Sequence, residues 1–296
     1  MNWQNLNSEK QMDTVYLNGQ FIPRNEAVIS PDDRGFLFGD SVYEVTRWYG
    51  GYFFDLPAHA KRLRRSLTET RINWQDAERI EEISEELIQR NDLGGDCAIV
   101  YIQVTRGVAP RNHAFPDPPV YPTSYGFAKR HSINTLLCEQ GTSLWLTPDL
   151  RWNRCDIKST ALLANVMAYQ EAHDNGCAEV CFVREGLVTE GAHSNIFFVR
   201  NDTLYTHPES QWILPGITRN NVVALATENN IPLIEEAVAA DMLAYMHESF
   251  FCNTTGEIVP VLKIGEQVIG EGRPGPVTQK MQVLFRNLIQ SMDPRR

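Results

Sequence analysis

Apolar and polar residues alternate with a period of two in many short segments of the chain, and this period predicts β-strands. Turn dipeptides between neighbouring segments predict β-hairpins at Asn18-Gly19, Gly50-Gly51, Glu185-Gly186 and Asn201-Asp202. The strands are expected within 14–30 and at 42–49, 52–56, 97–105, 124–129, 143–147, 195–200, 203–206, 249–252, 258–264 and 267–269.

Other segments have apolar residues at helical spacing. In DAERIEEISEELIQR, the residues Ile80, Ile83, Leu87 and Ile88 fall on one face of a helix. The helices are expected at 57–72, 76–90, 160–174, 217–229 and from about residue 276. Because strands and helices are mixed and hairpins dominate, the predicted fold class is mixed α/β (α+β) rather than a regular βαβ array.

The length of 296 residues suggests two domains. The polar segment HSINT at 131–135 is the predicted linker between a first domain, residues 1–130 with a tail at 1–13, and a second domain, residues 136–296. The first domain contains GVAPRNHAFPDPPVYP, in which five prolines exclude a regular helix or strand ladder. A long loop inside a compact domain is usually functional or disordered.

The composition is that of an ordinary globular protein, with 43% hydrophobic and 22% charged residues. A net charge of −10 would repel a phosphate backbone, so no nucleic-acid partner is expected. No apolar run reaches 18 residues, which predicts no membrane span, and the polar N-terminus predicts a cytoplasmic protein. The six cysteines include no CxxC pair, and CAEVC at 177–181 lacks companion ligands, so thiols are expected and a metal site is not.

Lys158 differs from the other lysines in its setting. It lies between a short strand and an apolar helix, in DLRWNRCDIKSTALLANVM. An amine desolvated in such a setting is a nucleophile that can form a Schiff base with a carbonyl. A lysine at a helix start can equally pack its stem and keep its ammonium group in water. The remaining lysines lie in the tail, on a cationic helix, before the linker, in a hairpin and on the last helix: Lys10, Lys61, Lys129, Lys263 and Lys280.

Two segments have the chemistry to bind an anion such as phosphate. Gly216-Ile217-Thr218 opens a predicted helix, where N–H groups and the helix dipole attract negative charge. Asn253-Thr254-Thr255-Gly256 offers hydroxyls and a flexible turn, and each segment alone could be only a cap or a turn. GEGRPG at 270–275 matches GxGxxG, but prolines occupy the would-be helix start, so we interpret it as a turn.

A set of motifs occurs in a fixed order along the chain: DRGFLFGDSVYEV (33–45), VTRG (104–107), RCDIKS around Lys158, QEAHDNGCAEV, TEG (189–191), LYTHP (204–208), ILPGITR (213–219) and NTTGEIVPV (253–261). Together they resemble the fold-type-IV aminotransferases that depend on pyridoxal 5'-phosphate (PLP), most closely the D-amino-acid aminotransferases. The resemblance covers the chain beyond the N-terminal tail. It implies a small N-terminal α/β domain and a larger C-terminal mixed α/β domain that binds PLP.

The resemblance also implies a role for each matching residue. Lys158 matches the lysine that holds PLP as a Schiff base and then moves protons as a general base and acid. Glu190 matches the carboxylate that pairs with the pyridine nitrogen and keeps the ring an electron sink. Contacts with the phosphate, or with the ring in the case of the leucine, are implied for Arg62, Leu214, Ile217, Thr218 and Thr254.

Substrate binding is implied for Arg111 and His113, which match the Arg-x-His pair that D-amino-acid aminotransferases use for the α-carboxylate, and for Tyr43. A guanidinium fork suits a carboxylate, although both loop residues could simply be solvated. The implied reaction transfers the amino group of a D-amino acid, chiefly D-alanine, to a 2-oxoacid such as 2-oxoglutarate by ping-pong half-reactions. In that family the loop reaches the partner subunit's site, so a homodimer is implied.

Several alternatives stand beside this interpretation. Within the family they are a branched-chain L-amino-acid aminotransferase, an (R)-amine transaminase and an aminodeoxychorismate lyase, and the Arg-x-His pair argues against all three. A non-catalytic oligomeric scaffold is opposed by the retention of Lys158 and Glu190. The sequence departs from the family pattern, which affects hydrogen bonding around the site and side-chain preference, at Ala192, His193, Pro215, Asn253 and Gly256.

Overall fold

The computed structural model describes residues 13–295, so Lys10 and most of the predicted tail lie outside the described residues. The fold is mixed α/β and divides into two compact units. The N-terminal unit runs to His131 and also includes Lys158–Ala161, and the C-terminal unit contains Ser132–Ile157 and Leu162–Arg296. The sequence predicted a change of domain near residue 131, but it did not predict that the segment carrying Lys158 would pack with the N-terminal unit.

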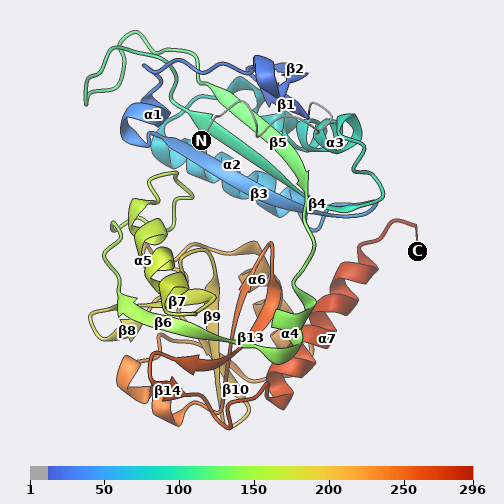
Figure 1. The fold of residues 1–296 in the computed structure, drawn as a ribbon, viewed down its shortest axis with the longest axis vertical. Helices are drawn as coiled ribbons and strands as arrows, with labels where there is room; N and C mark the ends of the chain where they lie inside the picture. Colours follow the sequence, from blue (N-terminus) through green and yellow to red (C-terminus); the bar gives the residue numbers. More distant parts are fainter. Residues whose placement is uncertain (1–12, 296) are drawn as a thin grey trace. The chain divides into compact units, whose positions relative to one another are not determined.

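Five antiparallel strands form the sheet of the N-terminal unit, in the order β2-β1-β5-β4-β3 (Figure 1). They are β1 (Thr14–Leu17), β2 (Gln20–Pro23), β3 (Ser41–Tyr49), β4 (Cys97–Thr105) and β5 (Ser124–Arg130). Asn18 and Gly19 have positive φ angles of 49° and 88°, as a two-residue hairpin turn requires, so the hairpin predicted here is confirmed.

The strand predicted at 52–56 is wrong. The structure has an isolated bridge between Trp48 and Phe53 there. Helix α2 (Leu56–Thr70) begins at once, with Pro57 in its first turn, and this leaves too little chain for a second strand.

Helices α2 and α3 cover the sheet of the N-terminal unit (Figure 1). Helix α3 (Ile80–Arg90) buries its predicted apolar face against β1, β4 and β5. The first turn of the helix predicted at 76–90 is a 3-10 turn instead, η3 (Gln75–Arg79). Two short elements were not predicted, the 3-10 turn η2 (Arg24–Glu26) and helix α1 (Arg34–Phe38).

A nine-stranded sheet forms the C-terminal unit, in the order β11-β10-β9-β12-β13-β6-β7-β8, with β14 paired to β13 (Figure 1). The β10–β11, β13–β6 and β6–β7 pairs are parallel and the others antiparallel. The strands are β6 (Thr142–Pro148), β7 (Glu179–Arg184), β8 (Leu187–Val188), β9 (Asn195–Arg200), β10 (Thr203–Thr206), β11 (Leu233–Glu235), β12 (Glu248–Asn253), β13 (Glu257–Ile264) and β14 (Gln267–Val268).

Helices pack around this sheet and enclose an apolar core. They are α4 (Thr135–Gln140), α5 (Leu163–Asp174), α6 (Ile217–Glu228), α7 (Pro276–Ser291) and the 3-10 turn η4 (Ala240–Tyr245). The core between them includes Leu144, Ile196, Phe198, Phe251, Val259 and Ile264. Among residues 13–295, no helix has the length and apolar character to cross a membrane.

Helix α5 begins at Leu163, three residues later than predicted. The preceding segment is extended against β3, where the N–H of Thr160 donates to the carbonyl of Ser41 at 3.1 Å and Ser159 forms a bridge with Val42. A backbone engaged in strand pairing cannot also form a helical turn. The GxGxxG match at 270–275 is a turn between β14 and α7, because Glu248 accepts the first N–H groups of α7.

Candidate active site

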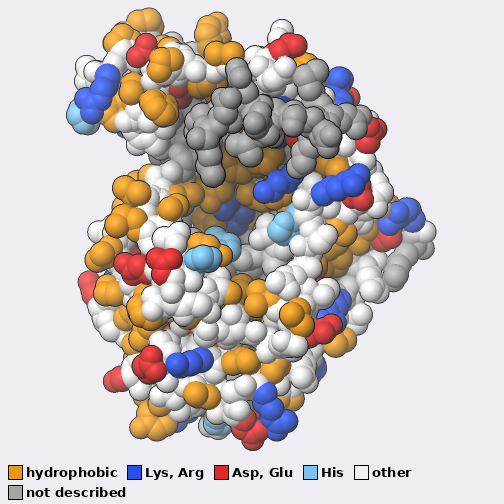
Figure 2. Space-filling model, in the orientation of Figure 1, with side chains coloured by type: hydrophobic (Ala, Val, Ile, Leu, Met, Phe, Trp, Pro, Cys, Tyr) orange, Lys and Arg blue, Asp and Glu red, His pale blue; other side chains and the backbone are white. Residues whose placement is uncertain are grey.

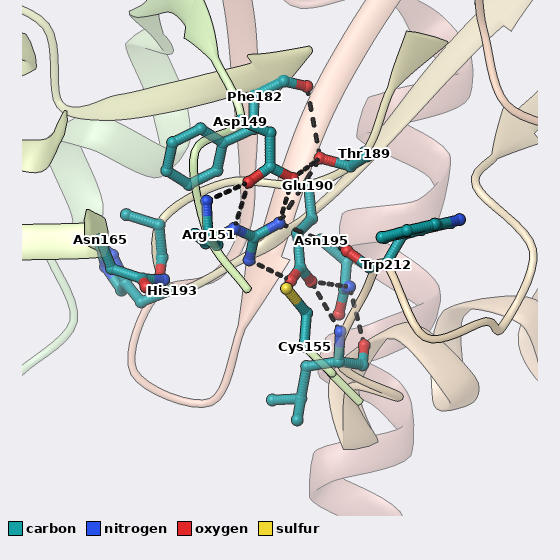
Figure 3. Close-up of polar contacts among 12 residues, drawn as sticks. Asp149, Arg151, Cys155, Asn165, Phe182, Thr189, Glu190, His193, Asn195 and Trp212 are labelled. Atoms are coloured by element: carbon teal, nitrogen blue, oxygen red, sulfur yellow. Dashed lines mark hydrogen bonds and ion pairs between the residues drawn. The ribbon is translucent and has the colours of Figure 1, made fainter. Parts of the chain in front are cut away.

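Glu190 lies buried in the C-terminal unit at the centre of a polar cluster (Figure 3). One carboxylate oxygen accepts a hydrogen bond from Nη1 of Arg151 at 2.6 Å. The other accepts from Nδ2 of Asn195 at 2.9 Å and from the N–H of Leu214 at 3.0 Å. Each carboxylate oxygen therefore has a partner, so the side chain is fixed in one orientation.

The charge on Glu190 is balanced within the cluster. Arg151 donates from Nη2 to Asp149 at 2.9 Å, and Arg184 lies 3.1 Å from the same carboxylate (Figure 3). Burial raises the pKa of Glu190 to about 7, against the opposing effect of the Arg151 guanidinium. The carboxyl group is therefore poised to change protonation near neutral pH.

The strands of the C-terminal unit hold Glu190 in place. It follows β8, and its carbonyl accepts from the N–H of Phe182 on β7 at 3.0 Å. Asn195, which donates to the Glu190 carboxylate, is the first residue of β9 and pairs with Cys252 at the end of β12. The adjacent β7, β8 and β9 segments therefore define the geometry around this carboxylate.

The segment after Glu190 is anchored by Glu179, whose side chain is fully buried on β7. Its carboxylate accepts from the N–H of Ala192 at 2.9 Å and from Oγ of Ser194 at 2.8 Å, and it lies 2.9 Å from Nδ1 of His193. Ala192 and His193 thus depart from the family's serines without leaving this turn unsupported. The side chain of His193 is half exposed and meets the ring of Tyr169 edge to face.

Helix α6 begins at Ile217, directly after Leu214 and Pro215 and the N-cap residue Gly216. No side chain caps this helix, and Ile217 and Thr218 in its first turn are buried. The first N–H groups of a helix have no acceptor within it, so they are available to an anion.

Gly216 and the β12–β13 turn both lie next to Asn195. A Cβ atom on Gly216 would come 2.1 Å from Oδ1 of Asn195, so only glycine permits this approach. The turn that carries Thr254 follows Cys252, the residue paired with Asn195. Asn253 shapes this turn, because its Oδ1 accepts from the N–H of Gly256 at 2.6 Å. The structure thus brings Glu190, Leu214, the start of α6 and the Thr254 turn to one edge of the sheet.

Lys158 and Tyr43 lie together in the N-terminal unit. The N–H of Lys158 donates to Oγ of Ser66 at 3.3 Å, and its carbonyl accepts from the N–H of Tyr43 at 3.0 Å. The ammonium group lies over the Tyr43 ring, 4.3 Å from its centroid. The ring of Tyr101 also stacks with that of Tyr43, at 5.5 Å between centroids, and limits how far the Tyr43 ring can turn.

Arg62 is buried on α2 and forms a two-pronged ion pair with Glu44 on β3. Nε donates at 2.9 Å and Nη2 at 2.6 Å, and His59 also contacts this carboxylate at 3.0 Å. Burial alone would raise the pKa of Glu44, but the Arg62 guanidinium and His59 hold it well below its usual range. Glu44 therefore balances part of the positive charge that the sequence assigned to a phosphate.

Arg111 and His113 lie in the exposed loop between β4 and β5, and both contact the ring of Phe38. The guanidinium carbon of Arg111 is 4.9 Å from the ring centroid, and the rings of His113 and Phe38 are 5.4 Å apart. The two residues of the predicted Arg-x-His pair are therefore gathered on one aromatic ring.

Sequence reasoning missed the partners of the predicted residues, namely Arg151, Asn195 and Glu179. Arg151 precedes Lys158 by seven residues in DLRW, and its contact with Glu190 spans 39 positions, so no local spacing indicates it. The one signal for Asn195 is a polar residue at the start of the apolar strand NIFFV. Among residues 13–295, no three His, Cys, Asp or Glu side chains gather as a metal site would require.

Comparison with known proteins places these features in a family. The family model for amino-transferase class IV matches residues 41–264. A D-alanine aminotransferase from Staphylococcus haemolyticus is 39% identical over 95% of this chain and 99% of its own, and one from Bacillus licheniformis is 40% identical over 94% and 97%.

Solved structures of similar fold include the branched-chain amino acid aminotransferase of Escherichia coli, with a TM-score of 0.86 and 26% identity over 94% of this chain and 95% of the other. Another is a branched-chain amino acid aminotransferase with pyridoxamine 5'-phosphate, from the organism abbreviated T.th., with a TM-score of 0.85 and 26% identity over 95% of each chain. The protein is a transaminase of a PLP-dependent family: the chain belongs to the class IV aminotransferases.

Proposed function

We propose that this aminotransferase takes its amino group from a D-amino acid and passes it to a 2-oxoacid, with D-alanine and 2-oxoglutarate as the main pair. The relatives named D-alanine aminotransferase match almost the whole chain. The structural observation that carries the proposal is the placement of Arg111 and His113 together on Phe38, because a guanidinium and an imidazole side by side suit an α-carboxylate.

The residues of the C-terminal unit fit PLP. The uncapped start of α6 offers the N–H groups of Ile217 and Thr218 to a phosphate, and the buried Glu190 suits a cationic ring nitrogen. We assign Thr254 and Arg62 to the phosphate as well and Leu214 to the face of the ring. When bound, PLP supplies an electron sink next to the substrate Cα.

Two side chains would perform the proton chemistry. With a pKa near 7, Glu190 would ionise fully beside a cationic ring nitrogen and so keep that nitrogen protonated. Nζ of Lys158, which would hold the cofactor between turnovers, takes the proton from the substrate Cα in one half-reaction and returns a proton to Cα in the reverse one.

Handedness follows from two fixed groups of the substrate. Arg111, His113 and the Tyr43 hydroxyl would hold the carboxylate, and the amino group is fixed by the chemistry of the cofactor. The Cα–H bond must then point toward Lys158, and only one enantiomer meets this demand with its side chain in open space. The relatives' names indicate that this enantiomer is D.

The second candidate is a branched-chain L-amino-acid aminotransferase, which the similar solved structures favour. A titration of the PLP-loaded protein with D-alanine, L-alanine, D-leucine and L-leucine separates the two. We expect the cofactor absorption band to change with the D-forms. A response to L-leucine without one to D-alanine would replace the proposed function by the branched-chain activity, and a response to neither would leave the scaffold or an (R)-amine activity.

We also propose that the protein is a homodimer and works in the cytoplasm, where its six unpaired cysteines would remain thiols. Helix α5 buries only small residues in its own unit, and Leu163, Val166 and Met167 are 74%, 60% and 60% exposed. Hydrophobic side chains are visible on the surface in this region (Figure 2). An apolar helix face of this kind is typical of a subunit interface.

A further inference from the structure

The motif DRGFLFGD at 33–40 forms helix α1 and fastens it to the end of β4. Asp33 caps the helix by accepting from the N–H of Gly35 at 2.7 Å, and its other oxygen accepts from Oγ1 of Thr105 at 3.0 Å. A Cβ atom on Gly35 would lie 2.4 Å from Cγ2 of Thr105, so the helix packs this closely only with glycine there. Gly39 ends the helix with a φ of 65°.

Arg34, the first residue of α1, is 3% exposed and reaches the loop that carries Arg111 and His113. Its Nη1 donates to the carbonyl of Asn112 at 2.5 Å and to that of Ala114 at 3.3 Å. These two carbonyls flank His113. Within the part of the chain that the structure describes, they are the hydrogen bonds that tie residues 110–122 to the rest of the molecule.

Phe38, one turn after Arg34, provides the surface on which the loop's side chains rest. Its ring centroid lies 4.8 Å from the guanidinium carbon of Arg34 and 4.9 Å from that of Arg111. The ring of His113 meets it from a tilted direction. One aromatic ring therefore contacts both residues of the Arg-x-His pair and the arginine that holds the loop backbone.

Asp40 fixes the orientation of Arg34. Its Oδ2 accepts from Nε of Arg34 and from Nε of Arg106, each at 2.8 Å. Arg106 in turn lies over the ring of Phe115, 3.5 Å from its centroid, at the next position of the loop. Because both guanidinium groups bind one carboxylate, neither can turn without the other.

We infer that Arg34 is a positioning residue that sets where Arg111 and His113 meet the substrate carboxylate, with Phe38 and Asp40 as its supports. The inference rests on the proposed function for the identity of the substrate. Arg34 acts through main-chain carbonyls and touches no reacting atom. Removing it should therefore affect binding of every substrate that carries an α-carboxylate, with little effect on the chemistry once the substrate is bound.

The kinetic test uses Arg34→Gln in the PLP-loaded enzyme. We expect the KM values for D-alanine and 2-oxoglutarate to rise roughly tenfold while kcat stays within about twofold, because the lost interaction serves binding alone. Arg130→Gln, an exposed arginine of the same unit, is the matched control and should leave both constants unchanged. Arg34→Lys keeps a cation beside Asp40 but lacks the planar fork, so it should fold normally and give an intermediate KM.

A double variant separates positioning from general stability. If Arg34 acts through Arg111, then Arg34→Gln should add little to the KM of Arg111→Leu. Fully additive effects, or an unchanged KM in Arg34→Gln, would overturn the inference.

A measurement without substrate makes the inference independent of the proposed function. Trypsin can cleave after Arg111 only when the loop leaves its place on α1, so cleavage at this bond should be about tenfold faster in Arg34→Gln than in wild type or Arg130→Gln. Equal cleavage rates would overturn the positioning role. A wild-type enzyme that does not respond to D-alanine, combined with faster cleavage in the variant, would refute the proposed substrate and retain Arg34 as the residue that holds the loop.

Discussion

Lys158 and Tyr43 are joined twice, once through the backbone and once through their side chains. The N–H of Tyr43 donates to the carbonyl of Lys158 at 3.0 Å, and Nζ of Lys158 lies 4.3 Å from the centroid of the Tyr43 ring. The residue assigned to proton transfer is therefore fixed relative to a residue assigned to the substrate carboxylate. Strand β3 supplies both constraints, since Tyr43 lies on it and the segment after Lys158 pairs with it.

Lys158→Ala should abolish transamination, because no other described lysine shares its setting. Borohydride reduction of the wild-type holoenzyme followed by peptide mapping should label the peptide that contains Lys158. Lys61→Ala, an exposed lysine on α2, should retain wild-type turnover as the control. A label on a different lysine would refute the assignment.

Glu190→Gln should slow the chemical step rather than weaken substrate binding. An amide cannot balance a cationic ring nitrogen, so we expect kcat to fall by about 100-fold or more with a small change in KM. Glu185→Gln, an exposed glutamate in the preceding hairpin turn, is the matched control. A raised KM with unchanged kcat would instead indicate a substrate contact.

Gly216→Ala should destabilise the protein and weaken its hold on PLP. The new Cβ would lie 2.1 Å from Oδ1 of Asn195 and would displace the side chain that bonds Glu190. We expect a loss of about 1–3 kcal/mol in the free energy of unfolding, as overpacking typically costs. Gly94→Ala is the control, because nothing lies within 4 Å of its added Cβ. Equal melting temperatures of the two variants would contradict the close packing at Gly216.

The buried His59 should make the protein less stable in mild acid. Burial lowers the pKa of His59 in the folded state, against the opposing effect of Glu44, while an unfolded histidine titrates near 6.5. Its contribution to stability is therefore complete above about pH 6.5 and is lost as the pH falls below that value. Urea unfolding between pH 5 and 8 should show a shallower pH dependence for His59→Gln than for wild type. His173→Gln, at an exposed site on α5, should follow the wild type, and an unchanged slope in His59→Gln would refute the role of His59.

Val166→Asp should shift the proposed dimer toward a monomer, because it places a charge on the apolar face of α5. Light scattering after size exclusion measures the mass directly. Val283→Asp on α7 has a similar exposed fraction, 53% against 60%, and should leave the mass unchanged. A dimer that persists in Val166→Asp would place the interface elsewhere.

Local patterns predicted much of the fold. The strands β9 and β10 have the predicted bounds, because alternation and the turn at Asn201-Asp202 are both encoded within a few residues. Helix α1 was missed because its five residues are held by a distant contact with Thr105, which no local window contains. Strand β11 was missed because it is a short exposed segment whose parallel pairing with β10 lies across helix α6.

The candidate site shows the same division. The sequence identified Lys158, Glu190 and the start of α6, because each lies in a short motif that can be matched along the chain. The interactions that fix their charge states join residues far apart, such as Arg151 with Glu190. Burial and charge balance follow from packing, and they could not be read from the sequence.

The grip of Arg34 on the loop has a consequence for how new specificities arise in this chain. Arg34 binds the carbonyls of residues 112 and 114, and every amino acid carries a carbonyl whatever its side chain. Substitutions at 111 and 113 can therefore exchange one recognition group for another while the loop keeps its attachment. The segment is in effect a replaceable module, in which mutation can explore different substrates without first having to rebuild the scaffold that presents them.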